Sequence, residues 1–243
     1  MFNEIFFILI VSLAGSVIGS FIGIVKKPSE KFLYIMIAFA AGVMISLAFL
    51  ELIPASISTS SKIICAVGFL GGAVIMWGFD KITPHIHPEM VGQEQGKHLK
   101  KTAGYLLAGI FLHNFPEGIV IGIGSIASWK SGLIAAIAIA VHHIPEGICT
   151  SAPYYYLTKK RGRAFLISAS TLIPTLIGFL LAYFVFGGFS NNILGLIIGA
   201  TAGVLVYISG DELIPGSSDK VTSHSTIFSF IFGVVFVIIM NLF

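Results

Sequence analysis

The sequence predicts an all-α integral membrane protein, a single transmembrane domain over residues 1–243 with eight membrane-spanning helices. Apolar residues make up 56% of the chain and charged residues only 10%, and the mean hydropathy is +0.97. These values exclude an ordinary soluble domain. Stretches of about twenty apolar residues are long enough to cross roughly 30 Å of hydrocarbon as helices. The expected spans are residues 5–25, 32–55, 63–79, 104–128, 132–156, 164–186, 193–215 and 225–243.

The first span does not have the charge pattern of a secretory signal. It is preceded by Glu4, and no Lys or Arg occurs before Lys26, so the positively charged leading region is missing. We therefore expect it to remain in the mature protein. The two cysteines, Cys65 and Cys149, both fall inside expected spans, which predicts no disulfide framework. Cys149 lies three residues after Glu146 and is expected to be a packing residue, with contact to the polar site as the alternative.

Basic residues are distributed very unequally between the two sides of the expected bundle. One side has only Lys62 and Lys130. The loops after the first, third, fifth and seventh spans hold the other twelve: Lys26, Lys27, Lys31, Lys81, Lys97, Lys100, Lys101, Lys159, Lys160, Arg161, Arg163 and Lys220. Because basic loops stay in the cytoplasm, both termini are predicted to lie outside it. The net charge of +3 thus reflects topology and indicates no nucleic-acid partner.

Two polar motifs interrupt the fourth and fifth spans. Residues 113–118 read HNFPEG and residues 142–147 read HHIPEG, 29 positions apart. On a helix the His and the Glu of each motif, four residues apart, share a face. A single intramembrane His is often a hydrogen-bonded packing residue. A duplicated motif with a charged side chain, which costs about 2.5–3.5 kcal/mol at the centre of a membrane helix, favours a functional site.

The two motif helices are expected to be antiparallel neighbours, because the linker between them, Ser128 to Ser131, is short. Two imidazoles and two carboxylates would then converge on one point. The prolines Pro116 and Pro145 lack an N–H and predict an irregular helix there, with a backbone carbonyl such as that of Val141 released.

A second repeat relates the second and seventh spans. Residues 41–56 and 202–217 align without a gap at an offset of 161, with eight identities in sixteen positions. Both copies end in acid-Leu-Ile-Pro. By the span count they run in opposite directions, which predicts an inverted repeat of helices 1–3 and 6–8 around the central helices 4 and 5. Chance similarity between two apolar helices is the alternative.

Five of the eleven acidic residues lie inside expected spans: Glu51, Glu117, Glu146, Asp211 and Glu212. No Lys or Arg is available there to neutralise them. They must be protonated, hydrated or balanced by a cation. Imidazole nitrogen together with carboxylate oxygen suits Zn²⁺ and similar first-row divalent ions. We expect Glu51 on the outer side of the central motifs and Asp211 with Glu212 on the inner side.

The polar loop at residues 80–103 is expected on the cytoplasmic side and contains His85, His87 and His98. Three histidines in such a loop are compatible with loose metal binding and equally with a solvated linker.

The paired motifs, the eight spans, the outside termini and the His-bearing loop resemble the ZIP (Zrt/Irt-like) family of metal-ion transporters. Through that resemblance the first metal site maps to His113, Glu117, His142 and Glu146, with Glu51 nearby. The resemblance implies a second, adjacent site at Asn114, Glu117, His143 and Glu146. Many relatives have a Glu before the helix 6 proline, where this chain has Ile173, which leaves the second site a ligand short. Glu in the helix 2 ELIP segment is more like bacterial members with a broad metal range.

The predicted function is transport of a divalent transition metal into the cytoplasm by alternating access, in a bacterial-type inner membrane. Zn²⁺ is the first choice of substrate, with Fe²⁺, Mn²⁺ and Cd²⁺ open. An intramembrane zinc hydrolase is the alternative, but HExxH is absent from the sequence, and no enzyme is expected. A metal-responsive membrane sensor is a third candidate, but no soluble signalling domain is recognised in this sequence. The sequence leaves open the coupling ion and whether two copies form a homodimer.

Overall fold

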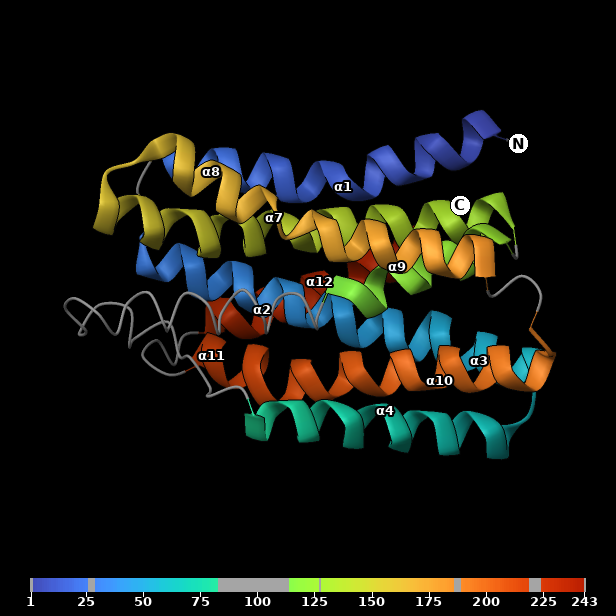
Figure 1. Cartoon of the computed structure of the whole chain (residues 1–243). Helices are drawn as coiled ribbons and strands as arrows, with labels where there is room; N and C mark the ends of the chain where they lie inside the picture. Colours follow the sequence, from blue (N-terminus) through green and yellow to red (C-terminus); the bar gives the residue numbers. More distant parts are fainter. Residues whose placement is uncertain are drawn as a thin grey trace.

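The computed structural model describes residues 2–25, 29–82, 114–126, 128–185, 189–218 and 224–242, and in this part of the chain all regular structure is helical (Figure 1). The first helices are α1 (Phe2–Val25), α2 (Glu30–Leu47), α3 (Ile53–Thr59) and α4 (Lys62–Ile82). Residues 114–126 form a further helix. The remaining helices are α7 (Trp129–Thr158), α8 (Arg161–Ala169), α9 (Leu172–Val185), α10 (Asn191–Ile208), α11 (Ile214–Ser218) and α12 (His224–Leu242).

Six helical segments in the described residues are long and apolar enough to cross a membrane: Glu4–Val25, Tyr34–Thr59, Lys62–Lys81, Trp129–Ala152, Arg161–Val185 and Asn191–Ser217. The apolar helix His224–Met240 is shorter than these. Large apolar side chains such as Phe6, Ile63 and Phe184 are more than half exposed on the outside of the bundle, as lipid-facing positions should be. The chain is therefore an all-α integral membrane protein.

Helix ends follow local capping rather than the limits of the apolar stretches. The helix expected at 132–156 begins at Trp129, because the Oγ of Ser128 accepts a hydrogen bond from the backbone N–H of Ser131 at 3.0 Å. It ends after Thr158 with Lys159 in the left-handed conformation, at φ 57°. Most helices consequently extend beyond the expected spans by a few residues.

Two π-helical segments lie at the acid-Leu-Ile-Pro endings of the repeat. They are η1 (Ala48–Leu52), which joins α2 to α3, and η3 (Ser209–Leu213), which joins α10 to α11. In each, the N–H of the residue before the proline bonds the carbonyl five residues back, Ile53 to Ala48 and Ile214 to Ser209. Such π-bulges occur frequently at functional sites. Figure 1 shows that α2 and α10 run in opposite directions.

Helix irregularity was expected at the motif prolines, and this expectation is wrong for Pro145. Helix α7 is α-helical from Trp129 to Thr158 through that residue. The turn before Pro116 lies outside the described residues, so the expectation for Pro116 stays a prediction. The sixth expected span, by contrast, is divided at Ser170 and Thr171 into α8 and α9. Pro174 lies in the first turn of α9.

The helices form two closely packed groups. The motif group comprises α1, residues 114–126, α7, α8 and α9, and the repeat group comprises α2, α3, α4, α10, α11 and α12, with α2 also packed against α7 across the two groups. Glycines allow backbone contact within each group: a Cβ on Gly15 would lie 1.8 Å from the Ala140 carbonyl oxygen, and one on Gly72 would lie 1.9 Å from that of Ala200. Every described glycine whose Cβ would fall under 3 Å from another helix's backbone has that neighbour in its own group. Figure 1 shows most of the motif group on one side of the molecule and α4, α10 and α11 on the other.

Candidate functional site

Four polar side chains from the two motifs meet inside the bundle. Asn114 and Glu117 come from the helix at 114–126, and His143 and Glu146 come from α7. Each pair is three residues apart and therefore lies on one helix face. The short connection at Ser128 makes the two helices antiparallel neighbours, as predicted, and the two faces turn toward each other.

Two direct contacts cross between these helices. His143 Nε2 lies 2.7 Å from Glu117 Oε2, and Asn114 Nδ2 donates a hydrogen bond of 3.0 Å to Glu146 Oε1. His143 Nε2 is also 3.6 Å from Glu146 Oε2. One imidazole thus lies between two carboxylates, and the amide of Asn114 fixes the second carboxylate in place.

The cluster is almost completely shielded from solvent. Asn114, Glu117 and His143 are all 0% exposed, and the Glu146 side chain is 17% exposed. Burying ionisable groups in this way is costly unless they are paired, protonated or bound to a cation. Glu146 is the one of these four side chains that is partly exposed.

A third helix supplies a backbone group to the cluster. Asn114 Nδ2 also donates to the carbonyl oxygen of Thr171 at 3.0 Å, and Thr171 lies at the break between α8 and α9. Ile173 is 47% exposed and so lies on the outer face of α9. The residue at position 173 is therefore not part of this cluster, whereas the carbonyl at 171, which sequence reasoning did not identify, is.

The remaining ligand candidates of the motifs fall outside what the structure describes. His113 precedes the described stretch, and the side chain of His142 is not described although its backbone belongs to α7. The structure therefore brings together the second expected set, Asn114, Glu117, His143 and Glu146, and leaves the first set as a prediction. His85, His87 and His98 of the 80–103 loop also lie outside the described residues.

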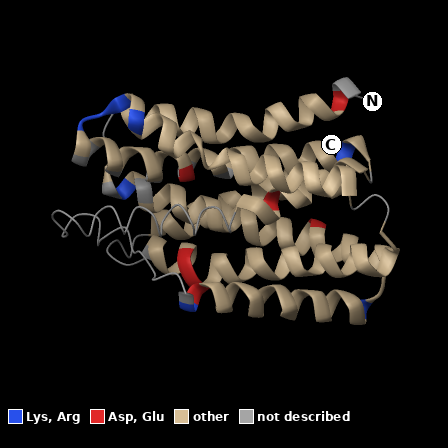
Figure 2. Ribbon diagram, viewed as in Figure 1, with Lys and Arg blue, Asp and Glu red and all other residues tan. Residues whose placement is uncertain are grey.

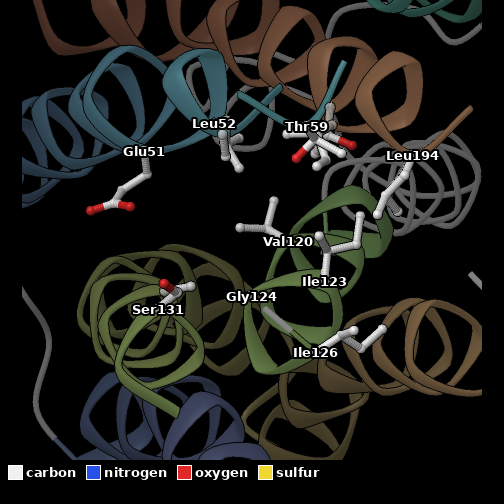
Figure 3. Close-up of a pocket in the computed structure, with 13 residues that line it drawn as sticks. Glu51, Leu52, Thr59, Val120, Ile123, Gly124, Ile126, Ser131 and Leu194 are labelled. Atoms are coloured by element: carbon white, nitrogen blue, oxygen red, sulfur yellow. The ribbon is translucent and has the colours of Figure 1, made fainter. Parts of the chain in front are cut away.

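Glu51 lines a separate cavity of about 150 Å³ (Figure 3). One wall comes from the repeat group, through residues such as Glu51, Thr59 and Leu194, and the other from the motif group, through Val120, Ile123 and Ser131. The cavity therefore lies between the two groups. Its lining is mainly apolar, and Glu51 is its one ionisable side chain among the described residues.

Asp211 and Glu212 are exposed on the π-helical segment η3. Close to them, the hydroxyl of Tyr207 donates a hydrogen bond of 2.9 Å to Asp80 Oδ2 at the end of α4. Because α2 and α10 are antiparallel, these acids and Glu51 lie toward opposite ends of the bundle, as Figure 2 shows for its acidic positions. Asp80 was expected only as the start of a loop, and its position at the end of an apolar span was the available sequence signal.

In the part of the chain that is described, no three His, Cys, Asp or Glu side chains are arranged so that they hold a metal ion as they stand. In the central cluster His143 Nε2 is instead engaged with Glu117. Cys65 is buried with its Sγ 3.9 Å from the Ile53 carbonyl oxygen, so it packs inside the bundle. The chemistry that remains available is exchange of the imidazole–carboxylate contact for bonds to a cation.

Comparison with known proteins identifies the family. The family model described as the ZIP zinc transporter matches residues 91–241. The zinc transporter ZupT of Escherichia coli O127:H6 is 32% identical over 210 residues, covering 83% of this chain and 82% of that protein. The ZupT proteins of the O1:K1 and K12 (DH10B) strains are 31% identical over the same length. The chain therefore belongs to the ZIP zinc transporter family and is a membrane transporter, not an enzyme.

Proposed function

We propose that this protein carries Zn²⁺, and related divalent ions such as Fe²⁺, Mn²⁺ and Cd²⁺, across the bacterial inner membrane into the cytoplasm. The observation that carries the proposal is the convergence of Glu117, His143 and Glu146 in the interior of an apolar helical bundle. The ZupT relatives are described as zinc transporters, which supports zinc as the principal substrate. The ion would be the cargo at this centre and would pass between two adjacent sites that share Glu117 and Glu146. His113 and His142 would complete the first site, and Asn114 and His143 the second.

The distances in the cluster favour binding with little rearrangement. Zn²⁺ binds imidazole nitrogen at about 2.0–2.1 Å and carboxylate oxygen at about 2.0–2.2 Å, which at a tetrahedral angle separates the two ligand atoms by about 3.4 Å. Glu146 Oε2 is already 3.6 Å from His143 Nε2, and Glu117 Oε2 is 2.7 Å from it. Movement of Glu117 by less than about 1 Å would admit the ion.

Proteoliposomes containing the purified protein test the function directly. We expect them to accumulate external Zn²⁺, with Fe²⁺, Mn²⁺ and Cd²⁺ competing, while protein-free liposomes do not. Absence of uptake for all four ions would overturn the proposed function.

We further propose eight spans built as an inverted repeat. The π-helical segments η1 and η3 support this proposal, because their residues correspond one to one at the sequence offset of 161. The reciprocal packing of α4 with α10 and of α12 with α2 is the pattern that a two-fold relation between the halves would produce.

The orientation that we propose places both termini outside the cytoplasm and residues 80–103 inside. Its support is the charge pattern: of the described basic residues, Lys62 and Lys130 lie at one end of the bundle (Figure 2). The other end carries Lys31, Lys81, Lys159, Lys160, Arg161 and Arg163.

Thiol labelling tests this orientation. A single Cys in place of Ser190 should react with an impermeant reagent in intact cells, because the α9–α10 connection is predicted to face outward. A single Cys in place of Gly162 should react only after permeabilisation. Both positions are exposed, so each serves as the other's control. The reverse labelling pattern would contradict the proposed orientation and, with it, the inferred direction of transport.

The acids beyond the centre are proposed to act at opposite ends of the pathway, Glu51 outside and Asp211 with Glu212 inside. Glu51→Ala is then expected to raise the apparent KM for external metal, because the ion loses its outer ligand. The double variant Asp211→Ala, Glu212→Ala is expected to lower the maximal rate, because release is slowed. Initial uptake rates against external Zn²⁺ distinguish the two, and a change in KM alone for both variants would contradict the assignment.

A further inference from the structure

Two buried hydroxyl groups, on helices that pack against the two motifs, make no hydrogen bond to the described residues. Ser16 on α1 is 1% exposed and Thr175 on α9 is 0% exposed. Neither Ser16 Oγ nor Thr175 Oγ1 has a hydrogen-bond partner in the part of the chain that is described. Buried hydroxyls are normally satisfied, by protein or by ordered water.

Neighbouring hydroxyls behave differently. In membrane helices Ser and Thr usually bond a carbonyl one turn back, as Ser12 does with Leu9 O at 2.8 Å and Ser151 with Gly147 O at 2.6 Å. For Thr175 the corresponding acceptor is the Thr171 carbonyl, which instead accepts the amide of Asn114. Thr175 therefore lies one helical turn from the point where α9 contacts the central cluster.

The backbone of each hydroxyl residue lies against a motif glycine. A Cβ on Gly118, which follows Glu117, would lie 2.0 Å from the Thr175 carbonyl oxygen. A Cβ on Gly147, which follows Glu146, would lie 2.9 Å from the Ser16 carbonyl oxygen. Each motif glycine thus brings a flanking helix, with its unsatisfied hydroxyl, against the turn that carries a motif glutamate.

The central cluster itself has matching unsatisfied acceptors. Asn114 Oδ1 and Glu146 Oε2 are buried and accept no hydrogen bond from the described residues. A buried water needs two to four polar partners, and hydroxyls and acceptors together provide both donors and acceptors. A divalent ion that enters the membrane interior partly hydrated needs such positions for its remaining waters.

We propose that Thr175 and Ser16 each hold a water molecule that links the transported ion to its flanking helix, Thr175 on the Asn114 and Glu117 side and Ser16 on the Glu146 side. The inference rests on the proposed function, because the ion is its ligand. It assigns these hydroxyls as positioning groups for a partly hydrated divalent cation. Neither residue contacts the ion directly.

The variants Thr175→Val and Ser16→Ala remove the hydroxyls with little change in shape. We expect each to raise the apparent dissociation constant for Zn²⁺ alone, and for Cd²⁺ alone, by about three- to tenfold, the usual effect of losing one hydrogen bond. The measurement is the increase in thermal midpoint of the detergent-solubilised protein with added metal. Thr175→Ser, which keeps the hydroxyl, should restore most of the affinity.

Ser12→Ala and Thr158→Val are the matched controls, since both hydroxyls already bond local carbonyls. Their metal affinity should equal that of the wild type. Unchanged metal affinity in Thr175→Val and Ser16→Ala would overturn the inference. In that case a higher thermal midpoint of the metal-free variants would show that the hydroxyls are unsatisfied groups with no part in metal binding. Failure of the wild-type protein to bind or take up either metal would instead sink the proposed function, and this inference with it.

Discussion

Replacing Glu117 and Glu146 together by Ala is expected to reduce Zn²⁺ uptake at least about hundredfold. The two carboxylates come from different helices, lie on either side of His143, and belong to both proposed ligand sets. Loss of even an outer-shell partner typically costs tenfold to hundredfold in metal affinity, so loss of two ligands should exceed that. Initial rates in proteoliposomes, normalised to inserted protein, give the measurement.

Stability must be separated from ligand loss in this experiment. Glu117 Oε2 lies 2.7 Å from His143 Nε2 with both groups fully buried, and removing one partner of such a pair commonly costs about 3–5 kcal/mol. The Glu117→Gln, Glu146→Gln variant keeps the side-chain volume and should insert normally while still losing uptake. Glu4→Gln, at an exposed position near the start of α1, is the control. Wild-type uptake by the Gln double variant would refute the site.

The central cluster was predictable because its determinants are local. The duplicated motif sets which residues share a helix face, and the short connection at Ser128 forces the two faces together. Neither step requires knowledge of distant packing. Sequence reasoning therefore anticipated that the two motif faces would converge, with His113 and His142 as the expected imidazoles. The set that the structure brings together, Asn114, Glu117, His143 and Glu146, was implied only by the family resemblance.

The backbone irregularity expected at Pro145 was misplaced. Pro145 passes through α7 without a break, whereas the segments before Pro54 and Pro215 become π-helical. A proline removes one hydrogen bond, but insertion of a π-turn also depends on how the neighbouring helices pack. The identity of the two repeat copies at acid-Leu-Ile-Pro was the sequence evidence that a shared backbone feature belonged there.

The hydrogen bond from Asn114 to the Thr171 carbonyl, at the break between α8 and α9, was missed for a related reason. The break at Ser170 and Thr171 follows no glycine, but Pro174 suits the first turn of a helix and so marks a new start just before it. With that break recognised, Thr171 would have been placed between the two helices, where its carbonyl meets the Asn114 amide. The partners of that carbonyl depend on tertiary packing, which the sequence pattern does not encode.

A cross-link between the two helix groups is expected to stop transport. Ile123 of the motif group and Leu194 of the repeat group both line the Glu51 cavity, and Figure 3 draws them on its walls. Cysteines at these positions, in a variant with Cys65 and Cys149 replaced by Ser, can be joined by a reversible bifunctional thiol reagent. In the fully cross-linked protein uptake should fall at least about tenfold, and partial cross-linking should give a proportional loss. Reductive cleavage of the cross-link should restore uptake.

The expected loss of transport follows from the difference between the packing within each helix group and the packing between the two groups. Glycine-mediated backbone contacts join helices inside each group, whereas α2 packs against α7 across the groups without such a contact among the described glycines. A cavity also lies between the groups beside Glu51, and both features favour movement of one group relative to the other. A cross-link within one group should therefore be harmless. Phe7 and Trp129, whose ring centroids are 5.9 Å apart in α1 and α7, provide that control as a Cys pair. Full uptake by the completely cross-linked Ile123–Leu194 pair would show that the ion crosses without movement between the groups, and alternating access of this kind would have to be abandoned.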